Sequence, residues 1–209
     1  MSSHQMVNER TSAKRIRFED PPIAKSLLGD VRWAWIWLIL RLYVGWEWLS
    51  AGWDKLNNPA WAGSKAGTAI SGFVNGALTQ TSGQHPNVQN WYAWFLSHVV
   101  LPNAVVWGYL ITWGEFLVGI ALILGIFTGI AAFFGSFMNM NYLLAGAVST
   151  NPILFAIATW LVLAWKTAGW WGLDRWVLPA LGTPWRPGRI FHHHGEQSQQ
   201  QMAHHAGQA

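Results

Sequence analysis

Two ionisable side chains, Arg41 and Glu115, stand inside long apolar stretches of this sequence. Arg41 lies in the segment RLYVGWEWLSAGWDKL, and Glu115 is the one charged residue between Val99 and Trp165. Placing a charged residue at the centre of a bilayer costs roughly 2.5–3.5 kcal/mol of insertion free energy. Such a residue is therefore expected to have a partner and usually a function. A carboxylate held near a cation in an apolar environment can exchange protons near neutral pH. Proton transfer is therefore the chemistry that these two residues suggest.

Counting along the expected helices places Arg41 and Glu115 at the same depth. With a rise of about 1.5 Å per residue, Arg41 lies roughly 12–15 Å, and Glu115 about 15 Å, above the cytoplasmic side. We therefore predict that the two side chains form a buried ion pair in which Glu115 accepts protons. The alternative is a purely structural pair that fixes the helix register, and both remain open, because a buried ion pair is weak evidence for function.

A second carboxylate, Glu47, lies about one and a half turns beyond Arg41 in the same segment. Asn139 and Asn141, in a later apolar segment, fall at much the same depth as Glu47. We expect Glu47 to be protonated or hydrogen-bonded to one of these two asparagines, because no basic residue lies level with it.

Asp54 and Lys55 fall at the outer end of the first apolar segment. A solvated pair whose long side chain reaches toward water is the usual arrangement at such a position. The alternative is that Lys55 attracts an anionic substrate, with Trp53 and Trp48 beside it.

The composition predicts an all-α integral membrane protein. Hydrophobic residues make up 52% of the 209 residues and charged residues only 11%, whereas a soluble domain carries about 25% charged residues. Spans are expected at about residues 31–53, 103–125, 128–148 and 152–167, each near the roughly 20 residues that cross hydrocarbon. The loop of residues 56–101 contains TAISGFVNGALTQ and NWYAWFLSHVV, whose apolar spacing predicts short amphipathic helices. The expected fold is a four-helix membrane bundle with an extracytoplasmic loop that carries these helices.

Lysine and arginine residues predict the orientation of the chain. They gather before the first span and after the fourth, and the positive-inside rule makes both of these ends cytoplasmic in a multi-pass protein of the cell membrane. Residues 1–29 are expected to be a disordered basic leader and residues 181–209 a disordered tail. The membrane domain between them comprises residues 30–180.

The missing residue types narrow the chemistry. The chain has no cysteine, so cysteine-ligated iron–sulfur clusters are excluded within it. None of the eight histidines falls within a predicted span, so no haem or metal site is expected in the membrane domain. The formal charge of +4 does not indicate nucleic-acid binding, because the basic residues cluster at the chain ends. A redox function would therefore depend on a diffusible quinone and on direct electron transfer or a second subunit.

Three segments of the sequence resemble the DoxX/DoxD family of four-helix membrane proteins. They are RLYVGWEWLSAGWDKL, GEFLVGIALILGIFTG and GWWGLDRWVLP, and the resemblance spans residues 38–179. The long outer loop is more similar to the DoxD type, described as the large subunit of thiosulfate:quinone oxidoreductase. In that family an arginine and a lysine flank the glycine-rich first helix and a glutamate lies in the second; the matching positions here are Arg41, Lys55 and Glu115.

The resemblance implies a membrane oxidoreductase subunit that passes electrons from a thiosulfate-like sulfur anion to quinone. Glu115 with Arg41 would then be catalytic, and Lys55, Trp53 and Trp48 would bind substrate. The implied partners are the lipid bilayer, quinone and, at the outer loop, a second small subunit or a soluble redox protein. The alternative function is a non-enzymatic membrane anchor or assembly partner for another redox protein.

Overall fold

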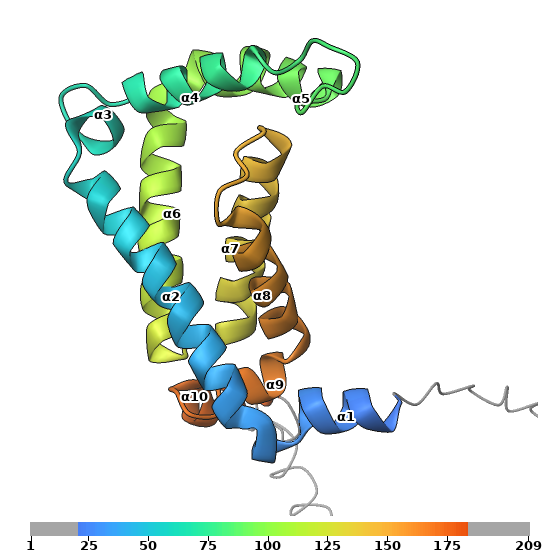
Figure 1. Cartoon of the computed structure of the whole chain (residues 1–209). Helices are drawn as coiled ribbons and strands as arrows, with labels where there is room; N and C mark the ends of the chain where they lie inside the picture. Colours follow the sequence, from blue (N-terminus) through green and yellow to red (C-terminus); the bar gives the residue numbers. More distant parts are fainter. Residues whose placement is uncertain (1–20, 184–209) are drawn as a thin grey trace, which may run out of the picture.

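The computed structural model describes residues 21–183, in which every regular element is helical, so the predicted all-α class is confirmed. Four long helices form the body of this part of the chain (Figure 1): α2 (Ala34–Leu56), α6 (Ala104–Leu124), α7 (Thr128–Leu144) and α8 (Asn151–Leu163). Short helices cover one end, here called the α4 end: α3 (Pro59–Ala62), α4 (Thr68–Leu78) and α5 (Asn90–Phe95). The opposite end, the α10 end, carries α1 (Pro22–Gly29), α9 (Trp165–Ala168) and α10 (Asp174–Ala180).

The four long helices overlap the four predicted spans, but their number as membrane spans is not confirmed. Among the described residues, one helical stretch, Asn90–Leu124, is both long enough and apolar enough to cross a membrane. The helix Asn151–Leu163 is apolar but shorter. The long stretch includes a π-helical turn, Leu96–Val100, and a 3-10 turn, Leu101–Asn103, that join α5 to α6.

The long helices expose many large apolar side chains. Trp46, Leu117 and Ile153 are 63%, 57% and 58% exposed. Extensive exposed apolar surface on the long helices is typical of a membrane or protein interaction site. One buried core cluster lies along the inward stripes of the four helices, and a second packs α4 and α5 at the α4 end.

Helix α1 corrects the predicted extent of the disordered leader. Its leucines Leu27 and Leu28 pack against the core, and their backbone carbonyls accept hydrogen bonds from Trp37 Nε1 and Thr167 Oγ1, both at 3.0 Å. The end of the predicted leader therefore folds back onto the bundle, because Leu27 and Leu28 pack against the core. The predicted disorder of residues 1–20 and 184–209 lies outside the described residues.

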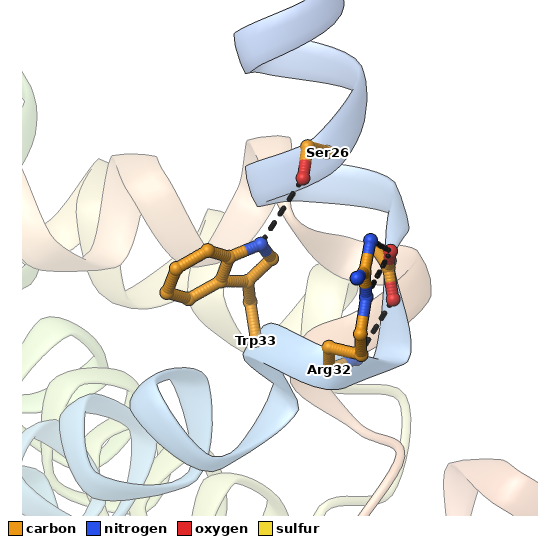
Figure 2. Close-up of polar contacts among 4 residues, drawn as sticks. Ser26, Arg32 and Trp33 are labelled. Atoms are coloured by element: carbon orange, nitrogen blue, oxygen red, sulfur yellow. Dashed lines mark hydrogen bonds and ion pairs between the residues drawn. The ribbon is translucent and has the colours of Figure 1, made fainter.

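The corner between α1 and α2 is held by short-range polar contacts (Figure 2). Trp33 Nε1 donates a hydrogen bond to Ser26 Oγ at 3.1 Å. The Asp30 carboxylate accepts hydrogen bonds from the side chain of Arg32 at 2.8 Å and from its backbone N–H at 2.9 Å. These two hydrogen bonds hold the pKa of Asp30 below its usual value.

Glycines bring the backbones of α2 and α6 into direct contact. A Cβ added at Gly52 would lie 2.5 Å from the backbone nitrogen of Phe116, and one added at Gly119 would overlap the backbone of Leu49. Small residues permit this close approach between helices in a membrane. The contact fixes the antiparallel register of the two helices, and with it the partners of every polar residue on them.

The close contact predicts a large effect of a single methyl group. Gly52→Ala should lower the free energy of unfolding by about 1–3 kcal/mol, because the added carbon has no space. The matched control is Gly72→Ala in α4, where nothing lies within 4 Å of the added carbon; it should gain about 0.5–1 kcal/mol from the better helix former. Unfolding in detergent followed by circular dichroism measures both, and an equal response of the two variants would contradict the tight α2–α6 contact.

Candidate functional site

Glu115 of α6 lies at the centre of a buried polar cluster formed by three helices. Lys55 Nζ of α2 donates a hydrogen bond to Glu115 Oε2 at 2.6 Å, and the Tyr142 hydroxyl of α7 donates one to Glu115 Oε1 at 2.5 Å. The side chain of Glu115 is 1% exposed and that of Lys55 is 19% exposed. Each carboxylate oxygen is therefore bound, one by a cation and one by a phenol. We refer to these three residues as the Lys55–Glu115–Tyr142 cluster.

The predicted ion pair between Arg41 and Glu115 is wrong. Arg41 is buried at the α10 end, where its Nη2 donates a hydrogen bond to the Trp171 carbonyl at 3.2 Å. Its guanidinium lies against Gly125, at the end of α6, and against Gly172. Counting depth assumed that α2 and α6 end in one plane, but α2 continues beyond the end of α6. Arg41 is consequently level with the turn after α6 and not with Glu115.

Arg41 lies beside a clasp that closes the α10 end. The Asp174 carboxylate accepts hydrogen bonds from the backbone N–H groups of Phe127 and Thr128, at 2.6 and 2.8 Å, and so caps the start of α7. The Asp174 N–H in turn donates to the Gly125 carbonyl at 2.8 Å. The segment GWWGLDRWVLP thus joins the α6–α7 turn to α10. Arg41 contacts this end of the bundle and not Glu115, so neither the catalytic nor the structural form of the predicted pair describes it.

The predicted hydrogen bond between Glu47 and an asparagine is also wrong. Asn141 Nδ2 donates to a backbone carbonyl of α7, and Asn141 Oδ1 accepts from the Tyr92 hydroxyl at 3.0 Å. Asn139 is fully buried, and neither atom of its amide has a hydrogen-bond partner. Glu47 is half-buried, because the buried stripe of α2 passes through Trp48 and leaves Glu47 at its edge.

The residues predicted to bind substrate divide into two groups. Trp48 is buried and stacks on Tyr142 with ring centroids 6.4 Å apart. Lys55 forms the ion pair described above, so it is not the solvated partner of Asp54. Trp53 and Asp54 are exposed, and the ring of Trp53 lies against that of Phe116, with centroids 6.2 Å apart. The structure therefore brings Trp48 and Lys55 to Glu115 and leaves Trp53 and Asp54 outside.

An apolar cavity of about 490 Å³ adjoins the Lys55–Glu115–Tyr142 cluster. It lies between α6, α7 and the helices that cover the α4 end, and Tyr142 forms part of its wall. The other aromatic side chains of the wall are Phe73, Tyr92, Phe95, Trp107, Phe134 and Phe137. Tyr142 thus belongs both to the wall of this aromatic cavity and to the cluster around the buried carboxylate.

The chemistry of this wall suits a planar apolar ligand. A volume of about 490 Å³ lies within the roughly 300–1,000 Å³ of typical small-molecule sites. Aromatic rings prefer stacked or edge-to-face neighbours, and Phe73 already meets the ring of Tyr142 edge-on, with centroids 6.1 Å apart. Within residues 21–183, no group of three or more His, Cys, Asp or Glu side chains lies together where it could hold a metal ion.

Tyr142 is the residue that the sequence predictions missed. Tyr142 follows Asn139 by three residues, which puts both on one face of α7. That spacing of two polar residues was the available signal. Tyr142 carries no charge, so a pattern of charged residues does not single it out. Tyrosine is also common at membrane interfaces, where it needs no functional explanation.

The sequence matches the model of one protein family. The family described as "TQO small subunit DoxD", where TQO stands for thiosulfate:quinone oxidoreductase, matches residues 36–185. This family is membrane-associated. Its description makes DoxD the small subunit, so the predicted large subunit is wrong. No curated protein and no solved structure matches the chain.

Proposed function

Because the chain belongs to the DoxD family, we propose that it is the membrane subunit of a thiosulfate:quinone oxidoreductase whose cavity beside Tyr142 binds quinone. One observation carries this proposal: a buried carboxylate is held between a lysine and a tyrosine at the wall of an aromatic cavity. Reduction of a quinone takes up two electrons and two protons. The cavity supplies the apolar site, and the cluster supplies a path for the protons.

The proton path runs from the α4 end to the cavity. Lys55 is 19% exposed, so it takes up a proton from water at the α4 end and passes one to Glu115 along their hydrogen bond. Tyr142 gives its proton to a quinone oxygen and takes one from Glu115, and the phenol is unchanged afterwards. Two such transfers complete the quinol. A proton donor within hydrogen-bond reach of the reacting atom contributes typically 10²–10⁴-fold to a rate.

The electrons come from the sulfur anion. Two thiosulfate ions each lose one electron and join through a new S–S bond, and the two electrons reduce the quinone. We assign this oxidation to the contact with a second subunit at the α4 end, because the helices there cover the cavity. In this scheme Lys55 is the counter-ion of Glu115, and the α4 end is extracytoplasmic in agreement with the distribution of basic residues.

A second candidate function is a non-enzymatic anchor for another redox protein. The observation in its favour is the surface of α5, where Trp91 and Trp94 are 62% and 59% exposed. Exposed tryptophans are frequent anchors of protein interfaces. The two functions differ in a measurable way, because an anchor has no need of a quinone.

Quinone binding by the purified chain therefore tests the proposal. Gly114 lines the cavity, and a carbon added there meets only the sulfur of Met138, at 3.4 Å. Gly114→Leu should fill the cavity without a backbone clash and weaken binding of a soluble short-chain quinone about tenfold or more. Quenching of tryptophan fluorescence measures the affinity, since Trp107 forms part of the wall.

The matched control places the same leucine at Gly72 of α4, an exposed position with open space around it. Gly72→Leu should bind the quinone as the unmodified chain does. Saturable binding that both variants share equally would remove the cavity as the quinone site. Absence of saturable binding in the unmodified chain would favour the anchor function.

A further inference from the structure

The aromatic cavity beside Tyr142 is polar at one end and apolar at the other. Three residues of its wall have oxygen-containing side chains, and all three lie at the α4 end: Tyr92, Asn141 and Tyr142. Leu117 and Phe134 line the opposite part of the wall, about two helical turns from the ends of α6 and α7 that meet at the α10 end. A ligand that matches both parts has a polar head and an apolar tail.

The same cavity is closed toward the α4 end and open toward the side of the bundle. Ile70, Tyr92 and Leu96 of its wall are only 1%, 4% and 3% exposed, and α4 and α5 lie across this end (Figure 1). Four wall residues on α6 and α7 are instead at least half exposed: Leu110, Leu117, Phe134 and Phe137. We call the opening between these four residues the α6–α7 seam. An exposed apolar rim of this kind is suited to contact with lipid.

The middle of the α6–α7 seam is formed by residues that yield easily. A carbon added at Gly114 of α6 meets only the Sδ atom of Met138 of α7, at 3.4 Å. Gly114 therefore leaves its side of the seam without a side chain, and Met138 is unbranched and adaptable. Rotation of one methionine side chain widens the seam for a planar ring.

Asn141 keeps a free hydrogen-bond donor at the polar end of the cavity. Its Nδ2 donates to the Phe137 carbonyl at 2.8 Å, and its Oδ1 accepts from the Tyr92 hydroxyl at 3.0 Å. A side-chain amide nitrogen has two N–H groups, so one of them is left for a ligand. The Tyr142 hydroxyl, in contrast, already donates to Glu115. Asn141 therefore supplies the donor that holds a headgroup oxygen before any proton moves.

We propose that the quinone enters the cavity sideways from the bilayer through the α6–α7 seam, with its headgroup beside Asn141 and its tail left in the seam. This inference rests on the proposed function, to which it adds the route of entry, the orientation of the ligand and a residue that binds the headgroup. The buried side chains at the α4 end close the other approach. The seam is also where the cavity wall meets the lipid.

Photolabelling in phospholipid nanodiscs tests the route of entry. The full chain receives a quinone whose tail carries a diazirine, and mass spectrometry identifies the labelled residues. The label should fall on the α6–α7 seam, and an excess of a short-chain quinone should remove it. The control probe, a diazirine on a plain alkyl chain, should label the exposed faces of all four long helices whether or not the short-chain quinone is present. Displaceable label on α2 or α8, or seam label that the short-chain quinone does not reduce, would overturn the route.

Asn141→Leu tests the contact with the headgroup. The substitution removes the amide donor at similar size, and the Tyr92 hydroxyl keeps the backbone carbonyl of residue 141 as an acceptor at 3.0 Å. The Kd of naphthoquinone should rise about three- to tenfold, the factor that one hydrogen bond contributes. The Kd of naphthalene, which has no oxygen, should not change. The matched control, Asn75→Leu at an exposed position of α4 outside the cavity wall, should bind both compounds as the unmodified chain does.

The outcomes separate this inference from the proposed function. No saturable quinone binding by the unmodified chain would end both. Quinone binding that Gly114→Leu weakens, together with full affinity in Asn141→Leu, would leave the cavity as the quinone site and remove the headgroup contact. Equal weakening of naphthoquinone and naphthalene binding in Asn141→Leu would mean that Asn141 only shapes the cavity.

Discussion

Substituting Lys55 with methionine should cost about 3 kcal/mol of folding free energy, because Glu115 would keep a buried charge without its counter-ion. Glu115 is 1% exposed and accepts the Lys55 hydrogen bond at 2.6 Å. The expected loss is at the lower end of the range for broken buried pairs, since Lys55 itself is 19% exposed. Reversible unfolding in detergent, with far-ultraviolet circular dichroism as the signal, measures it.

The double variant Lys55→Met with Glu115→Gln gives this prediction its sharpest form. It removes both charges, and the neutral amide still offers an oxygen to the Tyr142 hydroxyl. Most of the lost stability should therefore return, and the two single effects should be strongly non-additive. Asp54→Asn, which alters the exposed neighbour of Lys55, should change stability by less than about 0.5 kcal/mol. Additive losses in the double variant would mean that Lys55 and Glu115 do not depend on each other.

The positions of the long helices followed from the sequence because their determinants are local. The long uncharged stretch around Glu115 and the turn residues Gly125 and Asn151 mark where helices can run and end. The amphipathic spacing of TAISGFVNGALTQ likewise predicted α4, in which Ile70 and Val74 are buried. Each of these signals depends on neighbours a few residues apart.

The partners of the polar residues did not follow, because they depend on how helices slide past one another. Arg41 and Lys55 are 14 residues, or roughly 21 Å, apart along α2, so the offset between α2 and α6 decides which of the two meets Glu115. The contacts of Gly52 and Gly119 set that shift, but a sequence does not say which glycines on two helices meet. The extension of α2 beyond α6 therefore moved Arg41 away from Glu115 and brought Lys55 to it.

The α10 end was unpredictable for a related reason. Asp174 caps α7 across a separation of 46 residues from Thr128, and no local pattern connects these two positions. The segment that contains Asp174 carries part of the family resemblance, and in the structure this segment holds the α6–α7 turn. A motif shared with a family can thus mark a structural clasp as readily as a catalytic group.

Replacing Tyr142 by phenylalanine should lower the rate of thiosulfate-dependent quinone reduction about 10²–10⁴-fold, the contribution of a positioned proton donor. The substitution keeps the ring that stacks on Trp48 and lines the cavity, and it removes only the hydroxyl that is bound to Glu115. The rate at saturating quinone should fall while the KM for quinone stays close to that of the unmodified chain. Membranes that contain the chain and its partner subunit, supplied with thiosulfate and a soluble quinone analogue, allow this measurement.

Two further variants show whether the hydroxyl acts through Glu115. Glu115→Gln should lose a similar factor, and combining it with Tyr142→Phe should lose little more, because the two residues serve one proton path. Tyr109→Phe removes a hydroxyl from an exposed position on α6 and should leave the rate unchanged. Full activity of a folded Tyr142→Phe variant would remove the phenol from the proton path. Multiplying losses in the combined variant would separate Tyr142 from Glu115 and assign the two residues to different steps.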